Sequence, residues 1–502
     1  MKASTLTAKL LSLVALMLVV VMAFTACKDN KGTESGKTNA DVTSVEDNEE
    51  DTNSTGDAAD ASSENKDGSS KKQTTTSKQK NSTSKQSGSN NGPVNLTDYA
   101  NIPASVKEKG VHVLMWRKYT ESEQKQVNDF QNKTGIKVRT TVTTENEYST
   151  KLVAMITGKD SPDVVCLSSR NFPGFVTKSL QALDVNKFNL NDSIWYKNYM
   201  DEFRAGDKYY GAAIRGIWSV EDTNYVTYYN PAVLSECGIT EMPWDLYKAG
   251  KWNWAKQKEY ALAVKQHGTA KGYTGFATQG FDVFMNSAGL DFVDYDPVKA
   301  TFTNNLGVKN EALVTAWTEA AELNTAGATT GYDLTGFQQG KVGMFSAIAY
   351  GLYNQGSWLD VQNNATHKNM MAVPVAGPSQ SEAYIPVRPK TWGVPKGAKN
   401  VQGAAYFIRY YLDPSTIDMS STFYSKQYEE VFNIITAESA KKRTMNGQGI
   451  ADYVSDGTYN KICNELSKST VANINTVLNK YKGNVNTGVT RANKELARVA
   501  AK

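Results

Sequence analysis

The distribution of aromatic residues divides this chain into two unlike parts. No aromatic residue occurs between Phe24 and Tyr99, whereas the residues after Tyr99 contain all nine tryptophans. Residues 27–95 consist mostly of Ser, Thr, Asn, Asp, Glu, Lys, Gln and Gly. Such a segment buries too little apolar surface to offset the entropy lost on ordering it, so we expect a disordered linker there. The folded part of the chain is therefore expected within residues 96–502.

The first 26 residues have the pattern of a secretory signal peptide. Lys2 and Lys9 supply positive charge, Leu10 to Met22 form an apolar run, and small residues precede Cys27. The apolar run is shorter than a helix needs to cross a bilayer. The cysteine at the cleavage position resembles the signal of bacterial lipoproteins, although an ordinary signal peptide with an incidental cysteine is an alternative. We therefore predict an extracytoplasmic domain, lipidated at Cys27 and anchored to the cell membrane.

Length, charge and cysteine content limit what the rest of the chain can be. Roughly 400 residues are too many for one compact core, so two lobes are expected. A net charge of +4 is small for 502 residues and argues against a nucleic-acid partner. Cys166, Cys237 and Cys463 have no CxxC spacing, so we expect no metal site. Cys166 is interpreted as a core residue, and a bridge between Cys237 and Cys463 stays open.

The hydrophobic pattern after residue 110 alternates between that of strands and that of helices. We predict, in order, a strand at 111–116, a helix at 121–133 that ends at Gly135, a strand at 136–142, a helix at 148–157 and a strand at 164–167. This order indicates an α/β lobe with parallel strands. Further helices are predicted at 255–267, 310–323 and 404–412, and the tail from Tyr459 is mostly helical, with breaks at Gly483 and Gly488.

Known catalytic and metal-binding motifs are missing from the sequence. None of the three histidines has the spacing of a metal site, and neither a GxSxG elbow nor a Walker loop occurs. Asp291, Asp294 and Asp296 lack the central glycine and the distal glutamate of a calcium loop, so a surface loop is expected. We therefore predict neither catalytic residues nor a bound metal or cofactor.

Two acidic pairs are candidates for the carboxylates of a glycosidase. They are Glu145 with Glu147 and Glu221 with Asp222. Acidic residues this close in sequence are usually solvated. The chain therefore fits a binding protein better than an enzyme.

Aromatic residues occur next to several of the predicted strands. Trp116 and Tyr119 follow the first strand, Trp218 precedes a strand at 225–229, Tyr350 follows a strand rich in glycine, and Trp392 begins another. Ligands of open α/β sheets lie beyond the carboxyl ends of the strands. Flat rings there suit the apolar face of a pyranose, while polar side chains suit its hydroxyls. The pattern predicts a saccharide pocket.

Several motifs in a fixed order resemble a known family. They are Phe130-Gln-Asn-Lys-Thr-Gly-Ile-Lys-Val138, Asp160-Ser-Pro-Asp-Val-Val165, Gly206-Asp-Lys-Tyr-Tyr-Gly211, Tyr228-Tyr-Asn230, Trp252-Asn-Trp254, Phe337-Gln-Gln-Gly-Lys-Val-Gly-Met344 and Trp392-Gly-Val-Pro-Lys-Gly-Ala-Lys-Asn400. Together they make residues 111–411 similar to the extracellular solute-binding proteins of family 1, the maltose-binding-like sugar-binding subunits of ABC importers.

The resemblance implies a fold and a division into lobes. It implies an α/β, two-lobed fold of the periplasmic-binding-protein type II, with crossing strands between the lobes and closure around ligand by hinge motion. Lobe one would comprise about residues 105–225 and 390–440, and lobe two about residues 229–388 and 441–502. The crossings would lie near 225–229 and 388–392.

The resemblance also implies partners and ligand contacts. A monomer would bind a mono- or oligosaccharide and deliver it to the permease subunits of an ABC transporter. Tyr350 matches a stacking aromatic, and Ser169 and Arg170 lie in a loop that donates polar contacts. Leu167 stands where maltose-binding proteins have an aromatic, so a maltose-type ligand is not expected. The predicted ligand-binding residues are Trp116, Tyr119, Ser169, Arg170, Trp218, Tyr350 and Trp392.

Three alternatives to sugar import stay open at this point. Arg170 and Arg388 could grip the carboxylate of a sugar acid or another solute between them. The chain could instead be a secreted enzyme that acts on glycans, or a surface scaffold with a degenerate cleft.

Overall fold

The computed structural model describes residues 92–216, 223–353, 370–416, 423–451, 453 and 457–501. The signal peptide, Cys27, most of the linker, Trp218, Glu221 and Asp222 lie outside these residues. The backbone N–H of Val94 donates to the carbonyl oxygen of Asn186 at 2.9 Å, and Leu96 is buried. The described part therefore contacts the folded core from its first residues. No helix within it is long and apolar enough to cross a bilayer.

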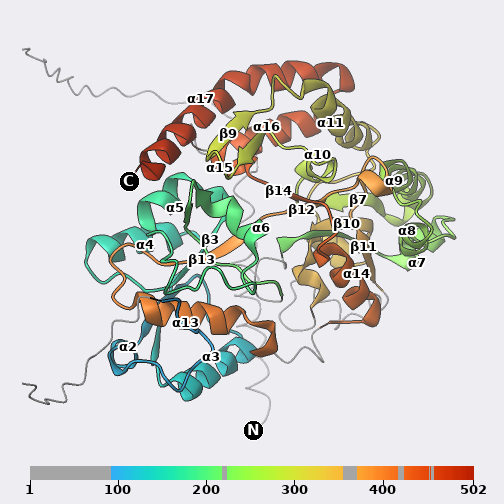
Figure 1. The fold of residues 1–502 in the computed structure, drawn as a ribbon. Coiled ribbons are helices and arrows are strands. Elements are labelled where there is room, and N and C mark those ends of the chain that lie inside the picture. The colour runs from blue at the N-terminus through green and yellow to red at the C-terminus, as the bar shows by residue number, and fades with distance from the viewer. Residues whose placement is uncertain are drawn as a thin grey trace, which may run out of the picture. The chain divides into compact units, whose positions relative to one another are not determined.

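The first sheet has the predicted parallel strands (Figure 1). Strands β1 (Val111–Met115) and β2 (Val138–Val142) pair in parallel, Val113 bridges to Val164 just before β3 (Val165–Ser168), and β13 (Lys390–Gly393) pairs antiparallel with β3. The helices of this part are α2 (Ala104–Lys109), α3 (Glu121–Thr134), α4 (Tyr148–Thr157), α5 (Gly174–Ser179) and α13 (Val401–Leu412). The predicted order of strands and helices is confirmed.

Helix α3 shows how the local sequence fixes one element of this layer. The hydroxyl of Thr120 accepts the N–H of Glu123, while the carboxylate of Glu123 accepts the N–H of Thr120, which forms a capping box. The helix ends at Gly135, whose φ of 72° is left-handed. Its apolar face packs on α13, with the rings of Phe130 and Phe407 5.3 Å apart.

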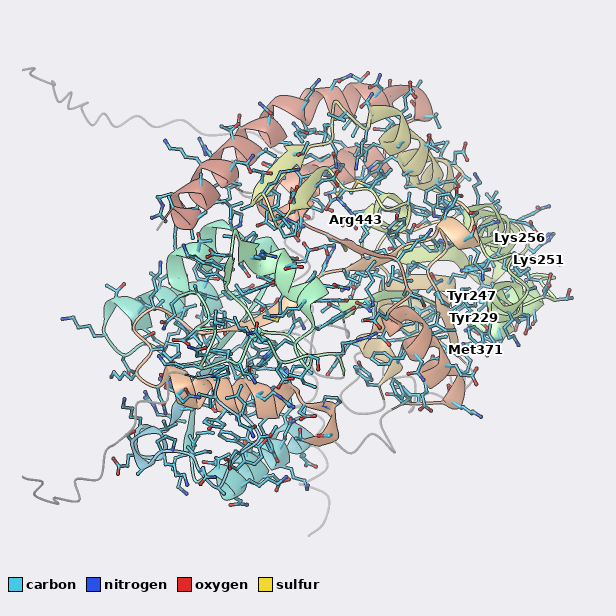
Figure 2. The ribbon with its side chains drawn as sticks, viewed as in Figure 1. Tyr229, Tyr247, Lys251, Lys256, Met371 and Arg443 are labelled. Atoms are coloured by element: carbon cyan, nitrogen blue, oxygen red, sulfur yellow. The ribbon has the colours of Figure 1, made fainter. Side chains whose placement is uncertain are left out.

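The second sheet has four strands in the order β11-β6-β10-β7. Their bounds are Met371–Pro374 (β11), Tyr225–Tyr229 (β6), Val342–Ile348 (β10) and Thr274–Thr278 (β7). Strand β6 is antiparallel to both of its neighbours, while β10 and β7 are parallel. Figure 2 labels Tyr229 and Met371 on the first pair, where the Tyr229 hydroxyl donates to the Met371 sulfur at 3.3 Å.

Helices surround the second sheet. They are α7 (Pro231–Glu236), α8 (Pro243–Lys248), α9 (Trp254–Gly268), α10 (Asp282–Ser287), α11 (Asn310–Thr325), α12 (Leu334–Gln338) and α14 (Lys426–Thr436). Helix α9 packs on β7, α12 on β10 and α14 on β11. Trp252 and Trp254 at the start of α9 are core residues, because both are buried and their indole N–H groups donate to the carbonyl oxygens of Pro374 and Ala376.

Short strands connect the two sheets. Strand β12 (Ile385–Val387) pairs in parallel with β14 (Lys442–Thr444), Val387 bridges to Asn224, and the chain then enters β13 of the first sheet. The limits of the two lobes stay a prediction. Helix α14 lies within residues 390–440, which were expected in lobe one, yet it packs on strand β11 of the second sheet.

The remaining elements are short, apart from the last helix. They are α6 (Lys197–Met200), β4 (Arg204–Ala205), β5 (Lys208–Tyr209), β8 (Val293–Asp296), β9 (Thr301–Asn304), α15 (Gly447–Ala451), α16 (Thr458–Ser467) and α17 (Ile474–Ala500). The predicted breaks at Gly483 and Gly488 are wrong, because α17 runs through both. Gly488 lies on the buried face of this helix and Gly483 has open space around it, so packing of the apolar face outweighs the low helix propensity of glycine.

Asp291 and the cysteines differ from what the sequence suggested. Asp291 is fully buried rather than on a surface loop, because its carboxylate accepts the N–H groups of Phe292 and Gly447 at 2.6 and 2.8 Å. Among the described residues no cluster of His, Cys, Asp or Glu could hold a metal ion. Cys237 and Cys463 are both free, so the bridge left open above does not form.

A buried carboxylate joins the first sheet to α13. Asp163 is 5% exposed and accepts three backbone N–H groups, from His112 at 2.9 Å and from Lys399 and Asn400 at 2.8 Å each. Because buried donors are costly to leave unpaired, this side chain holds the start of α13 against β1.

We expect the substitution Asp163→Ala to lower the free energy of unfolding by roughly 3 kcal/mol, since it leaves three backbone donors without an acceptor. Urea denaturation followed by circular dichroism measures the loss. Asp160→Ala is the matched control, because Asp160 is exposed and its carboxylate pairs with the exposed Arg139. Equal denaturation midpoints for the two variants would contradict the role of Asp163.

Candidate functional site

A cavity of about 360 Å³ lies at the carboxyl ends of β1 and β10. It is lined by Met115, Trp116, Arg117, Glu123, Glu145, Cys166, Ile348, Tyr350, Lys390, Trp392 and Tyr411. Met115 and Cys166 come from the first sheet, whereas Ile348 ends the central strand β10 of the second. The cavity therefore has walls from both sheets, and it brings Trp116, Tyr350 and Trp392 of the predicted set together.

An ion pair between the partly exposed Arg117 and the buried Glu123 forms one wall of the cavity. The guanidinium of Arg117 donates to both carboxylate oxygens of Glu123, at 2.6 and 2.7 Å. The hydroxyl of Tyr411 donates to the same carboxylate at 2.9 Å. The loop after β1, the start of α3 and the end of α13 thus meet at Glu123, whose side chain is 3% exposed.

Both members of this pair are held in their charged forms. Burial by itself would raise the pKa of Glu123, but the hydrogen bonds and charge of Arg117 outweigh it and hold that pKa below its ordinary value. Burial opposes the charge of Arg117 as well, yet the hydrogen bonds to Glu123 raise the pKa of Arg117. The pair therefore stays ionised, and its bidentate geometry fixes the direction of both side chains.

Two half-buried aromatic side chains give the cavity flat walls. The edge of Tyr148 contacts the ring of Trp116, with centroids 6.0 Å apart, and the ammonium of Lys390 lies 5.7 Å from the Trp116 ring centroid. Tyr350 is supported by the edge of Tyr353 at 5.9 Å. Both rings are thus held in place while part of their surface faces the cavity.

Trp392 lines the cavity mainly as a packed core residue. It is 4% exposed, pairs in register with Cys166 and contacts the ring of Tyr411 at 5.0 Å. Little of its surface is therefore available for stacking on a ligand. Trp116 and Tyr350 are less buried than Trp392 and expose more of their rings.

The polar residues predicted on the turn after β3 lie beside the cavity. The guanidinium of Arg170 pairs with Glu145 at 3.3 Å, and both side chains are more than half exposed, at 52% and 72%. Ser169 is buried, and its N–H donates to the carbonyl oxygen of Pro389 at 2.8 Å. Arg170 thus contacts the cavity lining through Glu145, and Ser169 joins the turn to the segment before β13.

Tyr119 and Arg388 do not line the cavity. Tyr119 packs beside Tyr411 with centroids 6.1 Å apart, and burial raises the pKa of its hydroxyl to about 12. Arg388 pairs with Asp282 at 3.4 Å and covers the ring of Tyr225, so it does not face Arg170 across the cavity. Trp218 lies outside the described residues.

Sequence analysis missed four polar residues of the lining. Arg117, Glu123, Lys390 and Tyr411 are brought together from three distant parts of the chain. One local signal existed, because Thr120 and Glu123 have the spacing of a capping box and Glu123 therefore had to lie near the end of the first strand. The pairing with Arg117 and Tyr411 depends on the packing of α3 against α13.

The fold is shared with solved solute-binding proteins. The ABC substrate-binding protein Lmo0181 from Listeria monocytogenes, in complex with cycloalternan, is 18% identical, with coverage of 75% of this chain and 98% of that one and a TM-score of 0.54. The galacto-N-biose-/lacto-N-biose I-binding protein from Bifidobacterium longum, in complex with lacto-N-biose, is 13% identical, with coverage of 76% of this chain and 97% of that one and a TM-score of 0.57. UgpB from Mycobacterium tuberculosis, in complex with glycerophosphocholine, is 14% identical, with coverage of 76% of this chain and 99% of that one and a TM-score of 0.56. The likeness shows the expected two-lobed fold of type II.

Comparison of the sequence with family models identifies the family. Residues 117–416 match the family of bacterial extracellular solute-binding proteins, and the chain belongs to that family. No curated protein sequence matches this chain. The family places the chain outside the cytoplasm and defines it by the binding of a small-molecule solute.

We expect Glu123→Gln to lower the free energy of unfolding at pH 7 by roughly 2 kcal/mol, because the buried Glu123 carboxylate loses its charge-assisted hydrogen bonds, while solvent screens the partly exposed Arg117. The folded-state pKa of Glu123 lies below its ordinary value, so the stabilisation is present above that ordinary value and is lost as the pH falls through the folded-state pKa. The difference between wild type and variant should therefore shrink at about pH 3.

Urea titrations at both pH values measure this difference. Glu121→Gln is the control, because Glu121 lies exposed in the same first turn of α3. A difference that is constant with pH, or equal for both variants, would contradict the stabilising ion pair.

Proposed function

We propose that this protein captures a neutral saccharide in the cavity between its two sheets and delivers it to the permease of an ABC transporter by hinge closure. The observation that supports a neutral ligand is the balance of charge around the cavity. The cationic lining residues are Arg117 and Lys390, and the anionic ones are Glu123 and Glu145, so the formal charges cancel.

Each of these charged side chains already has an interaction partner within the protein. Arg117 is bonded through both nitrogens to Glu123, Glu145 pairs with Arg170, and the Lys390 ammonium lies over the Trp116 ring. An anionic or cationic ligand would have to break one of these interactions, with the cost of leaving a charge unpaired. The hydroxyl groups of a neutral ligand can form hydrogen bonds to these carboxylate oxygens and N–H groups while the ion pairs stay intact, so that cost does not arise.

The size and walls of the cavity fit the same class of ligand. A volume of about 360 Å³ lies within the range of small-molecule sites. The exposed parts of Trp116 and Tyr350 offer flat apolar surface, and the charged side chains beside them offer hydrogen bonds. Two of the three solved relatives described above hold carbohydrate, cycloalternan and lacto-N-biose, which supports the proposal.

A second class of ligand follows from the third relative. UgpB holds glycerophosphocholine, a zwitterion with no net charge, which the balanced lining of this cavity would also tolerate. A sugar acid is disfavoured, because Arg388 pairs with Asp282 outside the cavity. The experiment below therefore includes neutral, anionic and zwitterionic probes.

The remaining parts of the proposal concern location and assembly. We infer that Cys27 is lipidated and that the protein acts as a monomer tethered to the cell membrane by residues 27–95. The motif at Cys27 and the composition of the linker support this. The protein is proposed to release its ligand unchanged, since the carboxylates at the cavity, Glu123 and Glu145, are each engaged with an arginine.

We expect a thermal-shift and calorimetric screen to find binding of a neutral mono- or oligosaccharide, with weaker or no binding of a sugar acid. Bound ligand raises the apparent stability by mass action. Trp116→Ala should weaken binding roughly tenfold to a thousandfold, because a stacking surface is lost. Chromatography of the bound sugar after release should recover it intact.

Two control variants separate stacking from folding. Tyr332→Ala removes an aromatic side chain that is 45% exposed away from the cavity lining, and should leave affinity unchanged. Trp392→Ala should instead lower the stability of the ligand-free protein by several kcal/mol, as expected for a buried aromatic. Preferential binding of an anion, or a cleaved sugar, would overturn the proposal.

We expect Cys27→Ala to abolish incorporation of a palmitate analogue and to leave the folded domain intact. Metabolic labelling of wild type and variant in a bacterial host measures this directly. The same label in both proteins would exclude Cys27 as the lipidation site.

A further inference from the structure

Helix α15 lies directly against the turn that follows β3. This turn, Ser168 to Asn171, includes the 3-10 segment η1 (Ser169–Asn171). A Cβ atom at Gly449 of α15 would lie 2.7 Å from the carbonyl oxygen of Arg170 and 3.1 Å from its carbonyl carbon and Cα. The φ angle of Gly449 is outside the left-handed region, so close backbone contact, not conformation, is what excludes a side chain there.

The segment that carries α15 is fixed by polar groups from two other segments of the chain, near residues 202 and 291–293. The N–H of Gly447 donates to the buried carboxylate of Asp291 at 2.8 Å. The amide of Asn446 donates to Glu202 at 3.0 Å, and Arg443, labelled in Figure 2, donates to the carbonyl oxygen of Val293 at 2.7 Å. Residues 443–447 therefore have little freedom to move away from the turn.

The turn itself is held from its other side by the strand that connects the sheets. The N–H of Ser169 donates to the carbonyl oxygen of Pro389, between β12 and β13, at 2.8 Å. The side-chain oxygen of Asn171 accepts the N–H of Ser168 at 3.2 Å. Only the side chain of Arg170 leaves this framework, and it reaches Glu145 on the cavity lining.

We propose that α15 positions the turn 168–171 beside the ligand cavity, and that Gly449 is the positioning residue that makes this contact possible. The turn has two supports, α15 and Pro389. Helix α15 follows strand β14, Pro389 follows strand β12, and these two strands pair with each other. A rotation of one sheet relative to the other at β12 and β14 is thereby passed to Arg170 and Glu145. The C-terminal segment thus takes part in ligand recognition without contacting ligand. This inference rests on the proposed function only in taking the cavity as the ligand site.

Hydrogen exchange in the ligand-free, full-length protein tests the contact without knowledge of the ligand. Gly449→Ala should speed exchange of the Ser169 and Phe172 amides about tenfold, because the added methyl group must displace the Arg170 backbone. Gly483→Ala is the matched control, since no atom lies within 4 Å of the position of its added Cβ. It should leave those amides at the wild-type rate.

A second variant covers the case in which Gly449→Ala does not fold. Asn446→Ala removes the bond to Glu202 without adding volume, and should also speed exchange at Ser169 and Phe172, by a smaller factor. If Gly449→Ala folds and both amides exchange at the wild-type rate, the inference is overturned. If Gly449→Ala does not fold, wild-type exchange at both amides in Asn446→Ala overturns it. So does an equal increase in Gly483→Ala.

Ligand affinity separates this inference from the proposed function. With a neutral saccharide found in the screen, Gly449→Ala should weaken binding about tenfold relative to Gly483→Ala, because the turn shifts away from the cavity. Absence of saccharide binding by the wild type would reject the proposed function and leave the exchange measurement to decide the role of α15. Faster exchange with unchanged saccharide affinity would overturn the part of the inference that concerns recognition.

Discussion

The cavity depends on one ion pair, between the partly exposed Arg117 and the buried Glu123. A carboxylate removed from water stabilises a fold only when its hydrogen-bonding capacity is satisfied, and here Arg117, Tyr411 and the N–H of Thr120 satisfy it. The pair joins the loop after β1 to α3 and α13, and so fixes the wall against which a ligand would lie. It also removes one positive and one negative charge from the cavity, which is the basis for expecting a neutral solute.

The connection between the sheets and the recognition of ligand share the same residues. Strand β12 continues through Pro389 into β13, whose Lys390 and Trp392 line the cavity. Strand β14, the partner of β12, continues into α15, which contacts the Arg170 backbone. In a protein that closes by hinge motion, this arrangement changes the geometry of the site whenever the two sheets rotate relative to each other.

Several elements of the fold could be predicted because their signals are local. The alternation around β1 and β2, the helix stop at Gly135 and the apolar run of β3 each depend on neighbouring residues, and all were predicted within a few positions. The breaks expected at Gly483 and Gly488 failed for the opposite reason. Whether a glycine ends a helix depends on how much apolar surface the helix buries, and α17 buries a face along its whole length.

The sequence by itself determined the class of the protein and the kinds of residue at its site. Aromatic side chains placed at strand ends need only the strand pattern to be noticed, and Trp116 and Tyr350 were found in this way. The tertiary structure alone decided which of them stay exposed, since Trp392 pairs in register with Cys166 of the distant strand β3 and is covered by Tyr411 of α13. It also decided which polar groups meet, because Tyr411 reaches Glu123 and Arg388 reaches Asp282 only after distant segments pack together. Exposure and charge pairing are properties of contacts between distant segments, and no local pattern encodes them.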